Sequence, residues 1–133
     1  TNNDVDDQDI SWSPNGNRIA FVSEIDGNPE IYTIRPDGSD KRRLTINSIR
    51  DENPVWSENS DQIAFISYLD DDSELVIMNA DGSNQTALTD TEGYNVRPTW
   101  SHDGSKIAFE SYRDGNDMAK VTTEQIEDYI SKR

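Results

Sequence analysis

The phrase WSPNGNRIAFVS, residues 12–23, returns twice along the chain in nearly the same form. It reads WSENSDQIAFIS at 56–67 and WSHDGSKIAFES at 100–111, so the tryptophan that opens each phrase recurs at intervals of 44 residues. Shorter matches such as IAF, DGS and LT keep the same spacing without an insertion. A fixed period of this length indicates a repeat architecture, in which each copy is one supersecondary unit that stacks on its neighbours.

Within one period, short apolar runs alternate with turn-forming residues. The runs of the first copy are DISWS, RIAFVS, IYTI and KRRLT, separated by SPNG, DGNPE and PDGS. In SPNG, Pro14 suits the second position of a type I turn and Gly16 the fourth. RIAFVS is too short for a helix and is typical of a strand covered on both faces, while IYTI is rich in β-branched and aromatic side chains. Four antiparallel strands per period describe one blade of a β-propeller.

The sequence therefore predicts an all-β fold, a partial β-propeller of about three four-stranded blades whose third blade is incomplete. These form a single domain, with blade 1 at about 8–46, blade 2 at about 52–90, a partial blade 3 at about 96–122 and a short C-terminal helix at about 123–132. A third strand of the last blade at 118–122 is only weakly indicated by its residues.

The expected C-terminal helix has its own signals. Thr122 and Gln125 have the spacing of a capping box, and Ile126, Tyr129 and Ile130 form an apolar stripe at helical spacing. This helix would either cover the open edge of the last blade, which an unpaired strand requires, or dock a partner.

The three tryptophans allow two interpretations. An exposed tryptophan can stack on a sugar ring. A tryptophan at a fixed place in every repeat is more typical of packing between adjacent blades, because a large ring buries much apolar area in a chain that is only 32% hydrophobic.

The three tryptophan phrases, together with IYTIRPDGS at 31–39 and LVIMNADGSNQTALT at 75–89, resemble the TolB-like propeller repeats, also called WD-like β-propeller repeats. The resemblance covers about residues 8–117. In this family six blades usually close a ring, and the family includes a periplasmic protein that binds a peptidoglycan-associated lipoprotein and the Tol machinery. Similar blades precede the catalytic domains of prolyl-oligopeptidase-like and tricorn-like peptidases. The resemblance therefore implies either a binding scaffold or the propeller portion of a peptidase.

Ring closure is the difficulty for a chain of this length. Propellers typically have ~4–8 blades, so fewer than three leave an open wedge with apolar end faces. We expect such a wedge to self-associate, with two copies around a two-fold axis approximating a six-bladed ring. A piece of a longer chain, or a monomer capped by the helix and the acidic N-terminus, are the alternatives.

The amino-acid composition argues against several classes of binding partner and site. A net charge of −15 and a pI of about 4.2 argue against binding of nucleic acids or acidic membrane surfaces. The acidic residues either serve the turns or reflect a salt-adapted surface.

The absence of cysteine excludes disulfides and thiolate metal sites, and no apolar run approaches the ~20 residues of a membrane span. The polar start TNNDVDDQDI is not a signal peptide, although a mature form could have lost one.

Catalytic chemistry is not expected. His102 is the only histidine and takes the turn place that Pro14 has in the first copy, and no GxSxG nucleophile motif is present. Most carboxylates belong to turns, so pairs suited to glycoside cleavage carry little information. The acidic runs at 4–9 and 70–74 offer oxygen ligands for calcium, but they do not match an EF-hand loop and are more typical of solvated charge. We therefore expect no cofactor, with calcium as the alternative.

The remaining candidate surface lies in the segments between blades, INSIRDE and DTEGYNVR, which we expect to form loops around one mouth of the channel. Arginine and tyrosine are typical anchors of protein interfaces. The predicted protein-binding residues are Ile49, Arg50, Asp51, Glu52, Tyr94, Asn95 and Arg97. Alternatively, the two arginines only balance nearby acids and tie the blades together.

The sequence thus favours a non-enzymatic protein-interaction or scaffold module, periplasmic or extracellular, whose partner is a protein, a further copy of itself, or both. The propeller portion of a peptidase and a purely structural repeat that self-assembles remain as alternatives.

Overall fold

A computed structural model describes residues 3–90 and 92–112. Within these residues every regular element is a strand. The expected C-terminal helix and the weak strand at 118–122 lie outside the described residues. The ten strands are β1 (Asp7–Trp12), β2 (Ile19–Ser23), β3 (Glu30–Ile34), β4 (Arg42–Arg43), β5 (Arg50–Trp56), β6 (Gln62–Leu69), β7 (Asp72–Asn79), β8 (Thr86–Ala87), β9 (Tyr94–Trp100) and β10 (Ile107–Tyr112).

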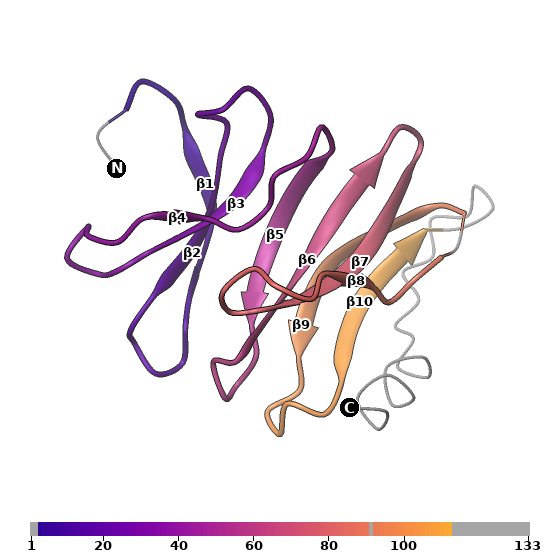
Figure 1. Cartoon of the computed structure of the whole chain (residues 1–133). Coiled ribbons are helices and arrows are strands. Elements are labelled where there is room, and N and C mark those ends of the chain that lie inside the picture. Colours follow the sequence, from indigo (N-terminus) through magenta and orange to yellow (C-terminus); the bar gives the residue numbers. More distant parts are fainter. Residues whose placement is uncertain (1–2, 91, 113–133) are drawn as a thin grey trace.

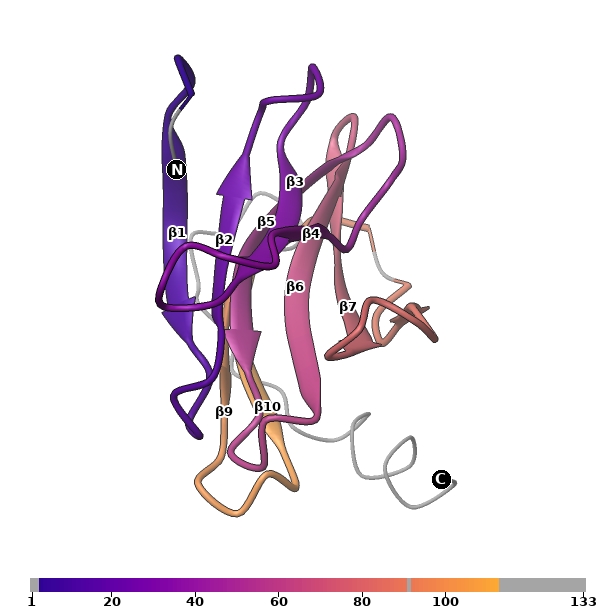
Figure 2. The same ribbon diagram turned by 60° about the vertical axis from the view of Figure 1, so that its left-hand side comes forward.

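The strands form three antiparallel sheets in chain order. β1–β4 make one four-stranded meander, β5–β8 make a second, and β9 pairs with β10 in the described part of a third. We call these sheets blades 1, 2 and 3. Figure 1 shows them arranged side by side along the chain, and Figure 2 shows the same arrangement turned by 60°. The all-β, partial-propeller architecture predicted from the repeat is confirmed.

The turn after each opening tryptophan explains why the phrase repeats. In blade 1 the Gly16 amide donates to the Ser13 carbonyl at 2.8 Å, and the Ser13 hydroxyl accepts the Arg18 amide at 2.9 Å. The same bonds recur around Ser57 and Ser101. The residue that closes the turn has a positive φ in all three copies, which accounts for glycine in two of them.

The first strand of every blade also carries the same β-bulge. Its register against the second strand shifts at one place, and one residue there has a left-handed φ: Asp9 at 52°, Asn53 at 54° and Arg97 at 53°. A bulge bends the strand and lets pairing continue beyond it. The first strands are therefore longer than the apolar runs suggested, and they begin at Asp7, Arg50 and Tyr94.

Each blade has two faces with different roles. We call the face that carries the opening tryptophan the first face and the opposite one the second face. The first apolar cluster joins the second face of blade 1 to the first face of blade 2 through Ala20, Val22, Ile31, Leu44, Trp56, Ile63, Phe65 and Met78. The second cluster repeats this arrangement between blades 2 and 3 through Ala64, Ile66, Leu75, Ile77, Ile107 and Phe109.

The tryptophans hold adjacent blades together wherever a preceding blade is present. The indole of Trp56 is only 7% exposed and donates to the Ser11 carbonyl of blade 1 at 3.2 Å. Trp100 makes the same bond to the Val55 carbonyl of blade 2 at 3.1 Å. Trp12, which has no blade before it in the structure, is 56% exposed. The packing interpretation is confirmed for two tryptophans, and the third lies on an open face.

Candidate functional site

The segments between blades differ from the expected loops. Ile49 directly precedes β5, whereas Arg50, Asp51 and Glu52 lie within it. Tyr94, Asn95 and Arg97 all lie in β9. The prediction that these residues form loops was wrong, because the bulge allows each first strand to stay paired up to its opening residue. Their side chains consequently alternate between buried and exposed positions.

Asp51 is a buried joint between blades rather than part of a surface. Its side chain is fully buried and accepts hydrogen bonds from the Ser67 hydroxyl at 2.6 Å and the Asn47 side-chain amide at 2.8 Å. Its backbone amide donates to the Pro29 carbonyl of blade 1 at 2.9 Å. Burial raises the pKa of the Asp51 carboxyl above its ordinary value, and the two hydrogen bonds oppose that rise.

Asn95 has the same role one repeat later. It is fully buried, its side-chain amide donates to the Ser73 carbonyl at 2.6 Å, and its backbone exchanges two 2.7 Å bonds with the Ser73 hydroxyl. These contacts tie β9 to β7 of the preceding blade. Asp51 and Asn95 therefore support the inter-blade joint and present no surface to a partner.

Arg50 and Tyr94 come together at one end of blades 2 and 3 with two residues outside the predicted protein-binding set, Tyr68 and Asp70. Of these, the sequence indicates Asp70 only as part of the acidic run at 70–74. A pocket of about 330 Å³ is lined by Arg50, Tyr68, Asp70 and Tyr94, which we call the Arg50 patch. The Arg50 guanidinium lies over the Tyr68 ring, 4.5 Å from its centroid. Tyr94 is 42% exposed.

A cation over an aromatic face is held electrostatically, so the Arg50 side chain is positioned before any partner arrives. The Arg50 Nε also pairs with the carboxylate of Glu52, a largely buried side chain, at 2.9 Å. Burial raises the pKa of the Glu52 carboxyl, and the neighbouring Arg50 charge opposes that rise. Tyr68 was missed because it becomes the cross-strand partner of Arg50 only when β5 extends past its bulge.

Arg97 lies elsewhere. Its side chain is 74% exposed and its Nη1 donates to both oxygens of Glu110, at 3.0 and 3.2 Å. It lines a separate hollow of about 280 Å³ along the first strands, shared with Asp9 and Asn53. There Asn53 donates from its backbone and side-chain nitrogens to the Asp9 carboxylate, at 3.1 and 2.8 Å, and so links blade 2 to blade 1.

The acidic run at 70–74 is divided among different tasks. Asp70 and Asp71 form the turn between β6 and β7, Asp72 accepts the Gly93 amide at 2.5 Å, and Glu74 accepts the Thr89 hydroxyl. Across residues 3–90 and 92–112, no group of three or more histidine, cysteine, aspartate or glutamate side chains is arranged to hold a metal ion.

His102 lies in the turn that follows β9, and its side chain is 98% exposed. Its Nδ1 is 3.6 Å from a Glu58 carboxylate oxygen. Within the described part of the chain, no helix is long and apolar enough to cross a membrane.

Solved structures share this arrangement of blades. A TolB protein from Agrobacterium tumefaciens superimposes with a TM-score of 0.73 at 24% identity, over 85% of this chain and 47% of that one. TolB from Acinetobacter baumannii gives a TM-score of 0.74 at 19% identity, over 90% of this chain and 32% of that one. The chain has a TolB-like β-propeller fold.

The TolB-like fold also occurs in enzymes. Dipeptidyl peptidase 4 from Porphyromonas gingivalis gives a TM-score of 0.70 at 20% identity, over 87% of this chain and 16% of that one. No protein-family model matches the chain. The chain spans about half of the Agrobacterium protein and a third of the Acinetobacter one, and at these identities the similarity establishes the fold alone.

Proposed function

We propose that the chain is a non-enzymatic protein-interaction module of TolB-like type, exported to the periplasm or cell surface, and that it docks a protein partner through the Arg50 patch. The observation that carries this proposal is the Arg50–Tyr68 stack beside the exposed Tyr94. Arginine and tyrosine are enriched among the residues that dominate binding energy. The proposed export rests on the resemblance to TolB-like proteins.

The backbone that carries the Arg50 patch is fixed by the buried residues Asp51 and Asn95, which link adjacent blades. Asp51 and Asn95 follow Arg50 and Tyr94 in their strands, and both are fully buried. Their hydrogen bonds to neighbouring strands hold the backbone under each anchor residue. A rigid, pre-positioned anchor loses little conformational entropy on binding, which favours affinity. The revised docking set is Ile49, Arg50, Glu52, Tyr68 and Tyr94.

The experiment is quantitative capture from a native envelope extract with the tagged chain as bait. We expect one protein at stoichiometric level, and at least about a tenfold loss of its binding with Arg50→Ala or Tyr94→Ala. Arg97→Gln is the control, because it removes another exposed arginine, 74% exposed against 53% for Arg50, that lies outside the patch. Equal capture by the two patch variants and the wild type, or an equal loss with Arg97→Gln, contradicts the proposal.

A second candidate function is the propeller portion of a peptidase. It is supported by the similarity to dipeptidyl peptidase 4. The sequence of the parent gene separates this candidate from the first. An α/β-hydrolase or tricorn-like domain encoded downstream would support a peptidase, and an uninterrupted series of blades would favour the interaction module.

Self-assembly is a third candidate, favoured by the open first face of blade 1. Ile10 is 67% exposed there and Trp12 is 56% exposed. Beside them lies a mainly apolar hollow of about 240 Å³, lined in part by Ile19, Phe21 and Ile34. Blades 2 and 3 bury the corresponding surface against the preceding blade, so this face has the composition of an interface.

We infer that a second copy would cover this face with its own blade 1, around a two-fold axis. Head-to-tail contact with blade 3 is less favourable, because Glu110 stands where Val22 and Ile66 provide apolar contacts in the first two blades. Burying that carboxylate against Trp12 would be costly. Sedimentation equilibrium tests this: we expect a dimer that Ile10→Lys dissociates and the exposed-site control Ile46→Lys leaves intact. A monomeric wild type contradicts it.

A further inference from the structure

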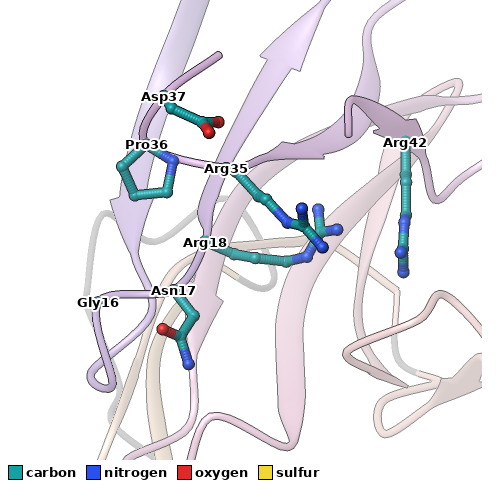
Figure 3. Close-up of a pocket in the computed structure, with 7 residues that line it drawn as sticks. All are labelled: Gly16, Asn17, Arg18, Arg35, Pro36, Asp37 and Arg42. Carbon is teal, nitrogen blue, oxygen red and sulfur yellow. The ribbon is translucent and has the colours of Figure 1, made fainter. Parts of the chain in front are cut away.

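Three of the four arginines of blade 1, Arg18, Arg35 and Arg42, line a single pocket at the end of the blade opposite to the strand end that carries the Arg50 patch. It has a volume of about 640 Å³ and lies between the β1–β2 turn and the β3–β4 turn. Figure 3 shows the guanidinium groups of Arg18 and Arg35 near each other in the centre, and Arg42 of β4 apart from them at the right. This concentration of cations stands out in a chain with a net charge of −15.

One carboxylate, Asp40, organises the three guanidinium groups. Arg42 holds it with two bonds, Nε to Oδ1 at 2.9 Å and Nη2 to Oδ2 at 2.8 Å. Arg18 also donates to the Asp40 carboxylate, and it bonds to the Thr33 hydroxyl and the Asp40 carbonyl, each at 3.1 Å. Arg35 approaches Asp40 only to 3.6 Å. The interactions with Arg42 and Arg18 lower the pKa of Asp40, so that it stays ionised.

Two of the three guanidinium groups remain exposed and keep N–H donors available to solvent. The side chains of Arg35 and Arg42 are 57% and 51% exposed, whereas that of Arg18 is 15% exposed and serves as a partly buried anchor. Asp37 is the second carboxylate at the pocket, and it is engaged within its own turn by the Ser39 amide at 2.9 Å and hydroxyl at 2.6 Å. A third carboxylate, Asp81 of blade 2, interacts electrostatically with Arg42 and accepts bonds from Ser83. The three carboxylates near the guanidinium groups therefore all accept local bonds, while Arg35 and Arg42 stay about half exposed.

Blade 2 shows that the fold does not require these arginines. The positions that correspond to Arg18, Arg35, Asp40 and Arg42, 44 residues later, are Gln62, Asn79, Asn84 and Thr86. The turn itself is unchanged: Ser83 donates to Asp81 from its amide at 2.9 Å and its hydroxyl at 2.5 Å, as Ser39 does to Asp37. Residues 52–90 contain nine carboxylates and no lysine or arginine.

We propose that Arg35 and Arg42, anchored by Arg18, form a binding site for an oxyanion, the phosphate or carboxylate group of a small ligand. Guanidinium groups match the planar geometry of such groups and bind them through paired, charge-assisted hydrogen bonds. Asp40 fixes the orientation of the arginines and at the same time competes with the incoming anion.

The test is a titration of the whole chain with inorganic phosphate in one arm and citrate in the other, at constant ionic strength, following the arginine Nε–H signals by NMR. We expect saturable shifts at Arg35 and Arg42, and the stronger arm identifies the anion class. Arg35→Asn and Arg42→Thr copy the residues of blade 2, so the turn has a precedent for folding. Each should weaken binding about tenfold, while Arg97→Gln leaves it unchanged.

Asp40→Asn also copies blade 2 and gives the sharpest outcome. Removing the competing carboxylate should tighten anion binding about tenfold. If the cluster served only to brace the turns, Asp40→Asn would lower the melting temperature without any gain in affinity. Shifts that do not saturate in either arm, or an equal loss with Arg97→Gln, overturn the proposal.

Discussion

Blades 1 and 2 present nearly the same first face to different surroundings. In blade 2, Trp56 is 7% exposed, and Ile63 and Phe65 are buried against the second face of blade 1. In blade 1, Trp12 is 56% exposed, although it opens the same phrase. The two blades thus provide a comparison within one molecule, in which local sequence is held almost constant and the neighbour is present or absent.

The difference shows that the repeated phrase encodes two separable properties. Its turn and its strand pairing form in every copy, because they depend on contacts within one blade. The burial of its tryptophan depends on the blade before it. Repeat architectures are expected to behave in this way, with an intrinsic term for each unit and an interface term between neighbours.

The largest predicted effect contrasts the two tryptophans. We expect Trp56→Ala to lower the free energy of unfolding by about 3–5 kcal/mol, because it removes a buried ring and leaves a cavity between blades. Trp12→Ala should change it by only about 0.5 kcal/mol, as is usual for exposed positions. Urea unfolding monitored by circular dichroism at low protein concentration measures both values. Equal losses would show that the two faces are not in different surroundings.

Two glycines at equivalent turn positions allow the contribution of the interface between blades 1 and 2 to stability to be measured separately. Gly38 and Gly82 occupy the same turn position, with φ of 83° and 88°. A Cβ at Gly82 would lie 3.0 Å from the Leu44 carbonyl oxygen of blade 1, whereas a Cβ at Gly38 meets nothing within 4 Å.

Both alanine variants should lose about 1–2 kcal/mol of stability from the left-handed backbone. Gly82→Ala should lose about 1–3 kcal/mol more, because it forces blades 1 and 2 apart. The difference between the two variants in urea unfolding measures the interface term. A Gly38→Ala variant as unstable as Gly82→Ala would contradict this account of the contact with Leu44.

The smallest predicted effect concerns the joint at Asp51, for which Asn95 is the neutral counterpart in blade 3. Burial raises the pKa of the Asp51 carboxyl above the ordinary value of 3.8, so the native state retains this proton where the unfolded chain has lost it. The protonated Asp51 carboxyl therefore contributes its full stabilisation below pH 3.8, and this contribution is lost as the pH rises through the raised pKa of the native state.

We expect Asp51→Asn to be more stable than the wild type at pH 7, by about 1 kcal/mol. The advantage should shrink as the pH falls toward 4, and thermal melts across this range record it. Ser67→Ala, which removes one donor to Asp51, is the control and should be destabilising at pH 7. A variant that is less stable than the wild type at pH 7 would show that the charge itself strengthens the joint.

Much of the fold could be predicted from the sequence, because it depends on local signals with a fixed period. The turn at Ser13–Gly16 and the apolar run at 19–23 occur where the pattern places them. The packing role of Trp56 and Trp100 also followed from their repetition. The open position of Trp12 was implied only by the incomplete ring.

The candidate site was less predictable, because it depends on register. The bulge at Asn53 is not apparent in a pattern of apolar and polar residues, yet it decides that Asp51 is buried and that Arg50 lies beside Tyr68. The arginine cluster did have a signal in the sequence, the dense run RPDGSDKRR at 35–43 in an otherwise acidic chain. Its convergence on Asp40 requires the two turns to be placed next to each other.

The repeats stack as blades through tryptophans that donate hydrogen bonds to the preceding blade, and every other conclusion depends on this stacking. Hydrogen–deuterium exchange of the three indole N–H groups, followed by NMR at low protein concentration, tests it most directly. We predict slow exchange for Trp56 and Trp100, whose indoles donate to backbone carbonyls, and exchange near the solvent rate for Trp12. Equal protection of all three indoles, or rapid exchange at Trp56, would contradict the account.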